Sequence, residues 1–277
     1  MNFFERILDF LDGQMATPTA YGWFHLMMLS IMIALAIFMV VKFRNADDKT
    51  NRKILLTFSI IMILFEIYKQ LNFSYNGSTD VWDYQWYAFP FQFCSVPMYV
   101  MLLAGLLHKG KVQNALFAFL GTYTLFAGLA VMLYPGDVFI GTIGINIQTM
   151  IHHGLMLVIG VYMLASGRAK LEHKTILSAS LVFAIIVAMA LGMDYVMYST
   201  GIVGSETFNM FFISPYFGNH LPILSMIRAD YPYLVFLAAY ILGFALVAYI
   251  MLLLGMLVRL ISRRINNCIK NKGCKTA

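Results

Sequence analysis

A single thiol stands in the apolar stretch FQFCSVPMY, at Cys94. Pro90 and Pro97 bracket it, and proline favours the first turn of a helix, so we expect Cys94 at or just before a helix start. Free backbone N–H groups and the helix dipole favour a thiolate there. A neighbouring histidine would complete an activated nucleophile, with a second polar group to orient the imidazole. The competing interpretation is a small apolar residue in the core.

Two other short patterns carry residues suited to such chemistry. Gln148 and His152 share one helical face, whereas His153 points about 100° away, so we expect only one of the two histidines to face a given partner. Glu66 and Lys69 are three residues apart, close enough to neutralise each other inside a bilayer. They either line a polar cavity with Cys94 or form a structural ion pair.

The amino-acid composition and the apolar runs predict the membrane-spanning helices that position these residues. Of 277 residues, 61% are hydrophobic and 12% charged, and the apolar residues fall in runs of span length. The pattern predicts an all-α membrane protein with seven transmembrane helices, over residues 21–42, 54–73, 91–108, 113–133, 146–166, 175–198 and 231–258. We divide the chain into an interfacial N-terminal segment (1–20), a seven-helix membrane domain (21–262) and a basic cytoplasmic tail (263–277).

Lysine and arginine are distributed unevenly among the connections. They gather in residues 42–53, 109–111 and 168–174 and in the tail, while the alternate connections carry almost none. The positive-inside rule therefore predicts an outer amino terminus and a cytoplasmic carboxyl terminus in a multi-pass protein of the plasma membrane. The basic residues that give the net charge of +6 then lie mostly at the cytoplasmic surface, where they face anionic lipid. We therefore expect no nucleic-acid partner.

This topology places the costly polar side chains at one depth. Placing an ionisable side chain inside a membrane costs free energy, so each such residue is a candidate functional residue. We expect a supporting polar site at outer-leaflet depth around Cys94, made of Glu66, Lys69, His152, Gln148, His25, Asp194, Asn219 and His220.

The sequence also resembles a known family. FEIYK in the second span, a cysteine in FQFCSVPM and a histidine in TMIHHGLMLVIGVYML resemble the TMEM164 and YwaF family of integral membrane proteins. Animal members are described as acyltransferases that move a fatty acyl chain between phospholipids. The resemblance implies Cys94 as nucleophile and His153 as general base, with Glu66 and Lys69 in the same site. The outer segment NFSYNGSTDVWDYQWYAF is longer than in the animal proteins, which leaves the acyl donor and acceptor open.

We therefore expect a lipid acyltransferase or transacylase, or an acyl-ester hydrolase, acting on a phospholipid or lysophospholipid without a cofactor or metal. A metal held by His152, His153, His220 and an acidic residue has no recognisable spacing to support it. The alternative from another class is a proton-coupled small-molecule transporter or a seven-helix receptor, since buried Glu66, Lys69 and Asp194 would suit proton movement.

Overall fold

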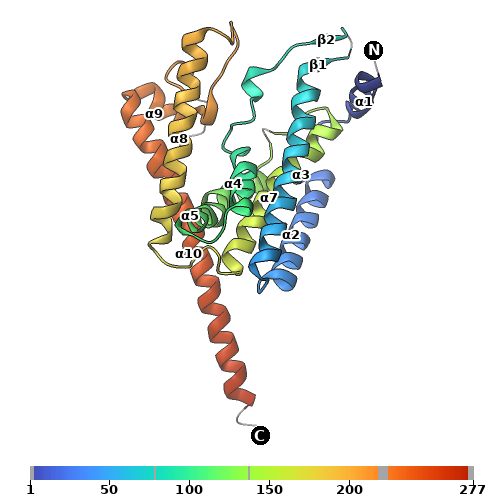
Figure 1. The fold of residues 1–277 in the computed structure, drawn as a ribbon. Helices are drawn as coiled ribbons and strands as arrows, with labels where there is room; N and C mark the ends of the chain where they lie inside the picture. Colours follow the sequence, from blue (N-terminus) through green and yellow to red (C-terminus); the bar gives the residue numbers. More distant parts are fainter. Residues whose placement is uncertain (1–2, 78, 137, 218–223, 274–277) are drawn as a thin grey trace.

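The computed structural model describes residues 3–77, 79–136, 138–217 and 224–273 (Figure 1). Apart from a two-stranded hairpin, the regular elements in this part of the chain are helices. They are α1 (Phe3–Leu11), α2 (Trp23–Phe43), α3 (Asp48–Ser74), β1 (Tyr75–Asn76), β2 (Val81–Trp82), η1 (Trp86–Ala88), α4 (Val96–Leu106), α5 (Lys111–Phe119), η2 (Leu120–Thr124), α6 (Leu125–Leu133), α7 (Ile143–Ala165), α8 (Thr175–Thr200), η3 (Met210–Phe212), α9 (Leu224–Asp230) and α10 (Tyr233–Gly273). The strands pair antiparallel.

Six helices in the described residues are long and apolar enough to cross a membrane. They are α2, α3, the continuous helix of α5, η2 and α6 (Lys111–Leu133), α7, α8 and α10. The prediction of an all-helical membrane protein is confirmed at this level. Seven spans and the orientation of the termini remain predictions.

The expected span over residues 91–108 differs from the rest. Only its 11 residues in α4 are helical, which makes about 16 Å of helix, against ~30 Å of hydrocarbon in a bilayer. Pro97 lies in the first turn of α4, and the residues before it form a turn. At the other end Leu107 turns to an extended conformation. The apolar run is thus longer than the helix that it forms.

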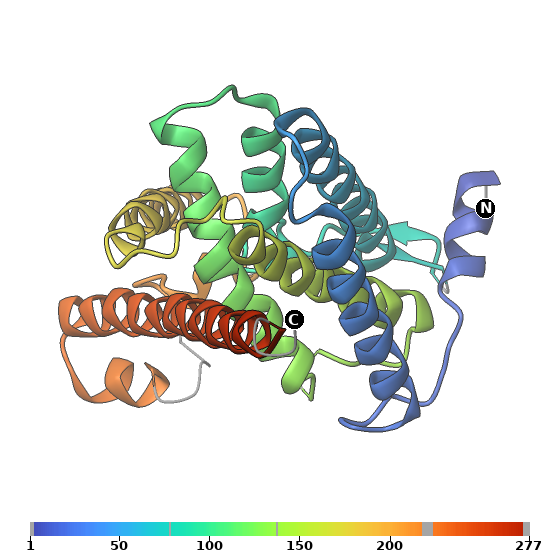
Figure 2. The ribbon, with the colours of Figure 1, turned by 90° about the horizontal axis from the view of Figure 1, so that it is seen from below.

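Helix α7 lies at the centre of the bundle and is its most enclosed membrane-length helix (Figure 2). Glycine permits close approach to its neighbours. A Cβ at Gly154 would meet the side chain of Met32 on α2, and one at Gly128 on α6 would lie 2.6 Å from the backbone nitrogen of Leu157. Small residues let helices approach closely where hydrophobic driving force between them is weak. These contacts fix α7, and with it His152 and His153.

The lysine- and arginine-rich connections lie together at one end of the bundle, which we call the basic end (Figure 1). Arg168 and Lys109, from two different connections, both pair with Asp48 at the start of α3. The hairpin and α1 lie at the opposite end, and α10 leaves the bundle at the basic end. Because α10 is helical to Gly273, the helix continues into the segment 263–277 that was expected to be a tail.

The segment after α1 is tied to the start of α7. The chain around Gln14 forms an isolated antiparallel bridge to Thr142. Backbone bonds join Met15 to Gly141 and Ile143 to Gly13. A structured segment therefore occupies residues 3–20, where the sequence predicted an interfacial region.

Candidate functional site

Cys94 lies in the turn that leads into α4, as the two prolines predicted. The backbone N–H groups of Ser95 and Val96 both donate to the Gln92 carbonyl, which closes this turn. Cys94 is half-buried. Its carbonyl oxygen is 2.9 Å from Nε2 of His152 on α7. The histidine therefore contacts the main chain of the residue that carries the thiol.

This contact defines the tautomer of a neutral His152. A carbonyl oxygen only accepts hydrogen bonds, so Nε2 must donate and hold the proton. Nδ1 is then the nitrogen with the free lone pair. It is buried, and no hydrogen-bond partner for it is present in the described part of the protein. A buried polar atom without a partner is uncommon in folded proteins and calls for an explanation. Here it leaves one basic nitrogen available for a proton.

His153 is oriented differently by its own helix. Its Nδ1 lies 2.8 Å from the carbonyl oxygen of Thr149, one turn earlier in α7. By the same reasoning Nδ1 donates, and Nε2 carries the lone pair. The ring centroids of His152 and His153 are 5.8 Å apart. Each of the two adjacent imidazoles thus donates a hydrogen bond from one ring nitrogen to a backbone carbonyl, and its other nitrogen carries a lone pair.

Four polar side chains, those of Glu66, Lys69, Gln70 and Tyr84, form a second network. Lys69 Nζ lies 2.7 Å from Glu66 Oε1, and Gln70 Nε2 donates to the same oxygen at 2.8 Å. Gln70 also donates to the Ala88 carbonyl and accepts from the Tyr84 hydroxyl. Burial, reinforced by the Glu66 carboxylate, raises the pKa of Tyr84. Tyr84 therefore stays a neutral donor that ties the connection between α3 and α4 to α3.

Lys69 links this network to the cysteine and histidines. Its ammonium group acts electrostatically on Cys94, His152 and His153, and Glu66 acts on Cys94. Lys69 is therefore close enough to act electrostatically on all three residues. The second Glu66 oxygen, Oε2, is buried and has no hydrogen-bond partner in the region that the structure describes.

A loop between α8 and α9 covers the turn that carries Cys94. Gln92 donates to the Asn209 carbonyl and accepts from the Phe211 N–H, while Asp194 on α8 accepts from the Met210 N–H. Phe211 has a left-handed backbone, with φ of 59°, yet its side chain is buried. Such a backbone is uncommon for a bulky residue and persists where the surroundings fix it. The three side-chain bonds supply that constraint.

The sequence model of the TMEM164 family matches residues 20–256, which include every side chain described above. The chain belongs to the TMEM164 family. No curated protein and no solved structure matches it.

The expected site residues of this TMEM164 protein do not all meet. Cys94, His152, His153, Glu66 and Lys69 gather as described. His25 instead bridges α2 and α6, accepting from the Tyr21 N–H at Nδ1 and contacting the Met132 carbonyl at Nε2. Both of its ring nitrogens are thus used by the backbone.

The remaining expected residues lie around this group or outside the described residues. Gln148 is buried one turn before His152, where its oxygen accepts from the Thr149 hydroxyl. Asp194 reaches the covering loop and keeps one buried oxygen, Oδ2, without a partner in the described residues. Asn219 and His220 lie outside the residues that the structure describes.

Two residues of the polar network around Glu66, Gln70 and Tyr84, are not among the site residues expected from the sequence. Gln70 lies four residues after Glu66 and therefore on the same helical face, a signal that was present in the sequence. Tyr84 belongs to an aromatic-rich connection, a composition more typical of interface anchoring. Its role follows only from the path of the connection over α3.

Proposed function

We propose that this TMEM164-family protein is a membrane-embedded acyl-transfer enzyme that uses Cys94 as its nucleophile and a phospholipid ester as acyl donor. The supporting observation is the contact between His152 and the main chain of Cys94, while the second imidazole nitrogen has no partner among the described residues. This contact supports a mechanism in which a thiol, a base and a cation act together in covalent catalysis.

The reaction proceeds in two balanced steps. The imidazole takes the thiol proton, and the sulfur attacks the ester carbonyl. A C–S bond forms, the ester C–O bond breaks, and the imidazolium returns its proton to the departing alcohol, a lysophospholipid. In the second step the imidazole takes a proton from the acceptor hydroxyl, whose oxygen bonds to the acyl carbon as the C–S bond breaks. The imidazolium then returns this proton to the Cys94 thiolate, which regenerates the enzyme. A lysophospholipid acceptor makes the protein a transacylase, and water makes it a hydrolase.

Two histidines compete for the role of base. The family resemblance assigns it to His153. The contact with Cys94 and the unpartnered Nδ1 favour His152. Lys69 would stabilise the negative charge that develops on the ester oxygen, since it acts on Cys94 and on both imidazoles.

Acyl exchange in proteoliposomes tests the proposal. Purified protein is mixed with an isotopically labelled phosphatidylcholine and a lysophosphatidylcholine, and products are followed by mass spectrometry. Cys94→Ala should abolish both transfer and release, whereas His173→Ala, a change in a histidine at the basic end, should leave them unchanged. Turnover that persists in folded Cys94→Ala would remove the thiol mechanism.

A proton-coupled carrier is the second candidate. It is favoured by one buried oxygen each on Glu66 and Asp194 that has no hydrogen-bond partner in the part of the chain that the structure describes. Carboxylates of this kind inside a membrane bundle suit proton binding. If folded, unchanged protein gives no acyl transfer or release, proton flux into the same liposomes becomes the deciding measurement. Glu66→Gln and Asp194→Asn should then stop the flux.

For topology, we propose seven passes that include the short α4, with the amino terminus outside and the basic end facing the cytoplasm of the plasma membrane. The alternation of lysine and arginine supports this orientation. In a Cys94→Ala background, a membrane-impermeant maleimide should label Cys268 and Cys274 only after the cells are permeabilised. Labelling of intact cells would reverse the orientation.

A further inference from the structure

A polar cavity lies at the basic end, away from Cys94. Its volume is about 370 Å³. Its lining comes from the starts of α3 and α5, the end of α4 and the connections between helices. The lining residues are Asp48, Asn51, Arg52, Leu107, His108, Lys109, Gln113, Phe117 and Arg168. Two arginines and one lysine face a single carboxylate, so the fixed charge of the lining is +3 − 1 = +2 with neutral histidine.

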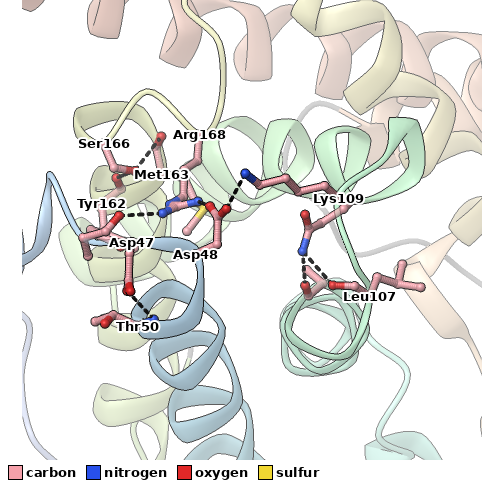
Figure 3. Close-up of polar contacts among 12 residues, drawn as sticks. Asp47, Asp48, Thr50, Leu107, Lys109, Tyr162, Met163, Ser166 and Arg168 are labelled. Atoms are coloured by element: carbon pink, nitrogen blue, oxygen red, sulfur yellow. Dashed lines mark hydrogen bonds and ion pairs between the residues drawn. The ribbon is translucent and has the colours of Figure 1, made fainter.

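The single carboxylate holds two of these cations. Figure 3 shows Lys109 and Arg168 pointing toward Asp48 from opposite sides. Arg168 Nη1 donates to Asp48 at 2.8 Å, and the Lys109 ammonium pairs with the other carboxylate oxygen. The Lys109 side chain is 81% exposed, so this pair is open to competition by another anion.

Backbone carbonyls fix both guanidinium groups in place. Arg52 donates to the carbonyls of Gly105 and Leu106, and Arg168 donates to the Ala46 carbonyl as well as to Asp48. A guanidinium group has about five N–H donors, so each arginine keeps roughly three for a further acceptor. Such preorganised guanidinium groups suit phosphate oxygens.

A second, independent observation points to a ligand. Asn51, on the first turns of α3, is only 1% exposed, yet its Oδ1 has no hydrogen-bond partner in the described residues. Asn51 lines the cavity. The oxygen and nitrogen of an amide exchange places when the group flips, so Asn51 can turn its NH2 group toward the cavity and donate to a phosphate oxygen, which only accepts.

We propose that this cavity binds a phosphate monoester, which takes over Lys109 and Arg168 from Asp48 and hydrogen-bonds Asn51. The charge of +2 matches a dianionic phosphate. The phosphate belongs either to a lipid headgroup, such as that of phosphatidic acid, or to a soluble phosphomonoester. This site is separate from the chemistry of Cys94, because it lies at the other end of α4.

Binding is measured on full-length protein in detergent micelles by native mass spectrometry. Dioleoyl phosphatidic acid is the lipid probe, dioleoyl phosphatidylcholine the zwitterionic comparison and glycerol 3-phosphate the soluble probe. Lys109→Gln should weaken phosphate binding about tenfold because it removes a charge-assisted contact. Asn51→Asp should weaken it by about the same factor because the added carboxylate repels the phosphate. Asp48→Asn should tighten binding, since it removes the competing carboxylate.

The matched control is Lys174→Gln. Lys174 is 77% exposed and pairs with Glu172 at the same end of the bundle, but it does not line the cavity. It should leave binding unchanged. If only phosphatidic acid binds with the expected changes in affinity among the variants, the ligand is a lipid. If glycerol 3-phosphate shows these changes, the ligand is a soluble phosphomonoester. Binding of neither probe, or an equal loss in Lys174→Gln, overturns the proposal. If Asn51→Asp does not fold, the opposite shifts in Lys109→Gln and Asp48→Asn still decide it.

Discussion

His152 and Cys94 are joined by a contact of 2.9 Å between the imidazole Nε2 and the cysteine carbonyl oxygen. The two residues are 58 positions apart and come from α7 and the turn before α4. The contact holds the imidazole beside the thiol-bearing residue through the main chain. It therefore survives any rotation of the cysteine side chain.

The base is decided by comparing His152→Ala with His153→Ala. If His152 is the base, its variant loses acyl transfer by at least about a hundredfold, while His153→Ala retains most of it. Rates of Cys94 alkylation by iodoacetamide give a second readout, because the thiolate is the reactive form. A loss confined to His153→Ala would assign the base as the family resemblance does.

The Glu66–Lys69 pair should behave as a buried unit. Glu66 is 5% exposed and Lys69 17% exposed, so Glu66→Gln leaves an uncompensated ammonium group and should cost about 3 kcal/mol of stability. The double variant Glu66→Gln/Lys69→Met should recover most of that loss. Thermal unfolding in detergent measures both. Additive losses in the double variant would show that the two side chains are not coupled.

Gly128→Ala should separate α6 from α7. An added Cβ would lie 2.6 Å from the Leu157 nitrogen and 2.7 Å from the His153 carbonyl oxygen, both backbone atoms that cannot rotate away. We expect a loss of about 2–3 kcal/mol, measured as a lower unfolding temperature. Gly243→Ala on α10 is the matched control, since a Cβ there meets nothing within 4 Å. An equal effect of both changes would contradict this packing.

Asp47 should make stability depend on acid. Its side chain accepts from the Thr50 N–H at the start of α3, which lowers its pKa from 3.8. The folded-state pKa is thus below the unfolded one. The stabilisation is complete above the unfolded pKa and is lost as the pH falls through the folded pKa. Asp47→Asn keeps the cap without titrating, so its stability should fall less between about pH 5 and pH 3. Identical acid profiles would exclude this role.

Sequence periodicity and hydropathy predict the depth of a residue better than its lateral position. The ion pair of Glu66 with Lys69 and the place of Cys94 before a helix follow from local spacing, and the structure has both. His25 lies near the start of its helix, as expected, but α2 places its ring against the backbone of α6. Which helices are neighbours depends on packing at residues such as Gly128 and Gly154, whose importance appears only when their surroundings are known.

The length of α4 shows a second limit. The apolar residues of 91–108 predict a full span because composition does not reveal where the backbone turns. The turn before α4 is closed by the Gln92 carbonyl, and Gln92 also binds the loop that contains Phe211. This long-range contact, and the left-handed backbone of Phe211, have no local signal in the sequence.

The π-helical segment η2 separates α5 from α6 within one continuous helix. A π turn holds one residue more than an α turn needs. Deleting one residue from 120–124 would therefore restore a regular helix while keeping α6 close to its present orientation relative to α5, with Gly128 still facing α7. When relatives of this chain are aligned, a one-residue gap at 120–124 should therefore occur together with a conserved glycine at the position of Gly128.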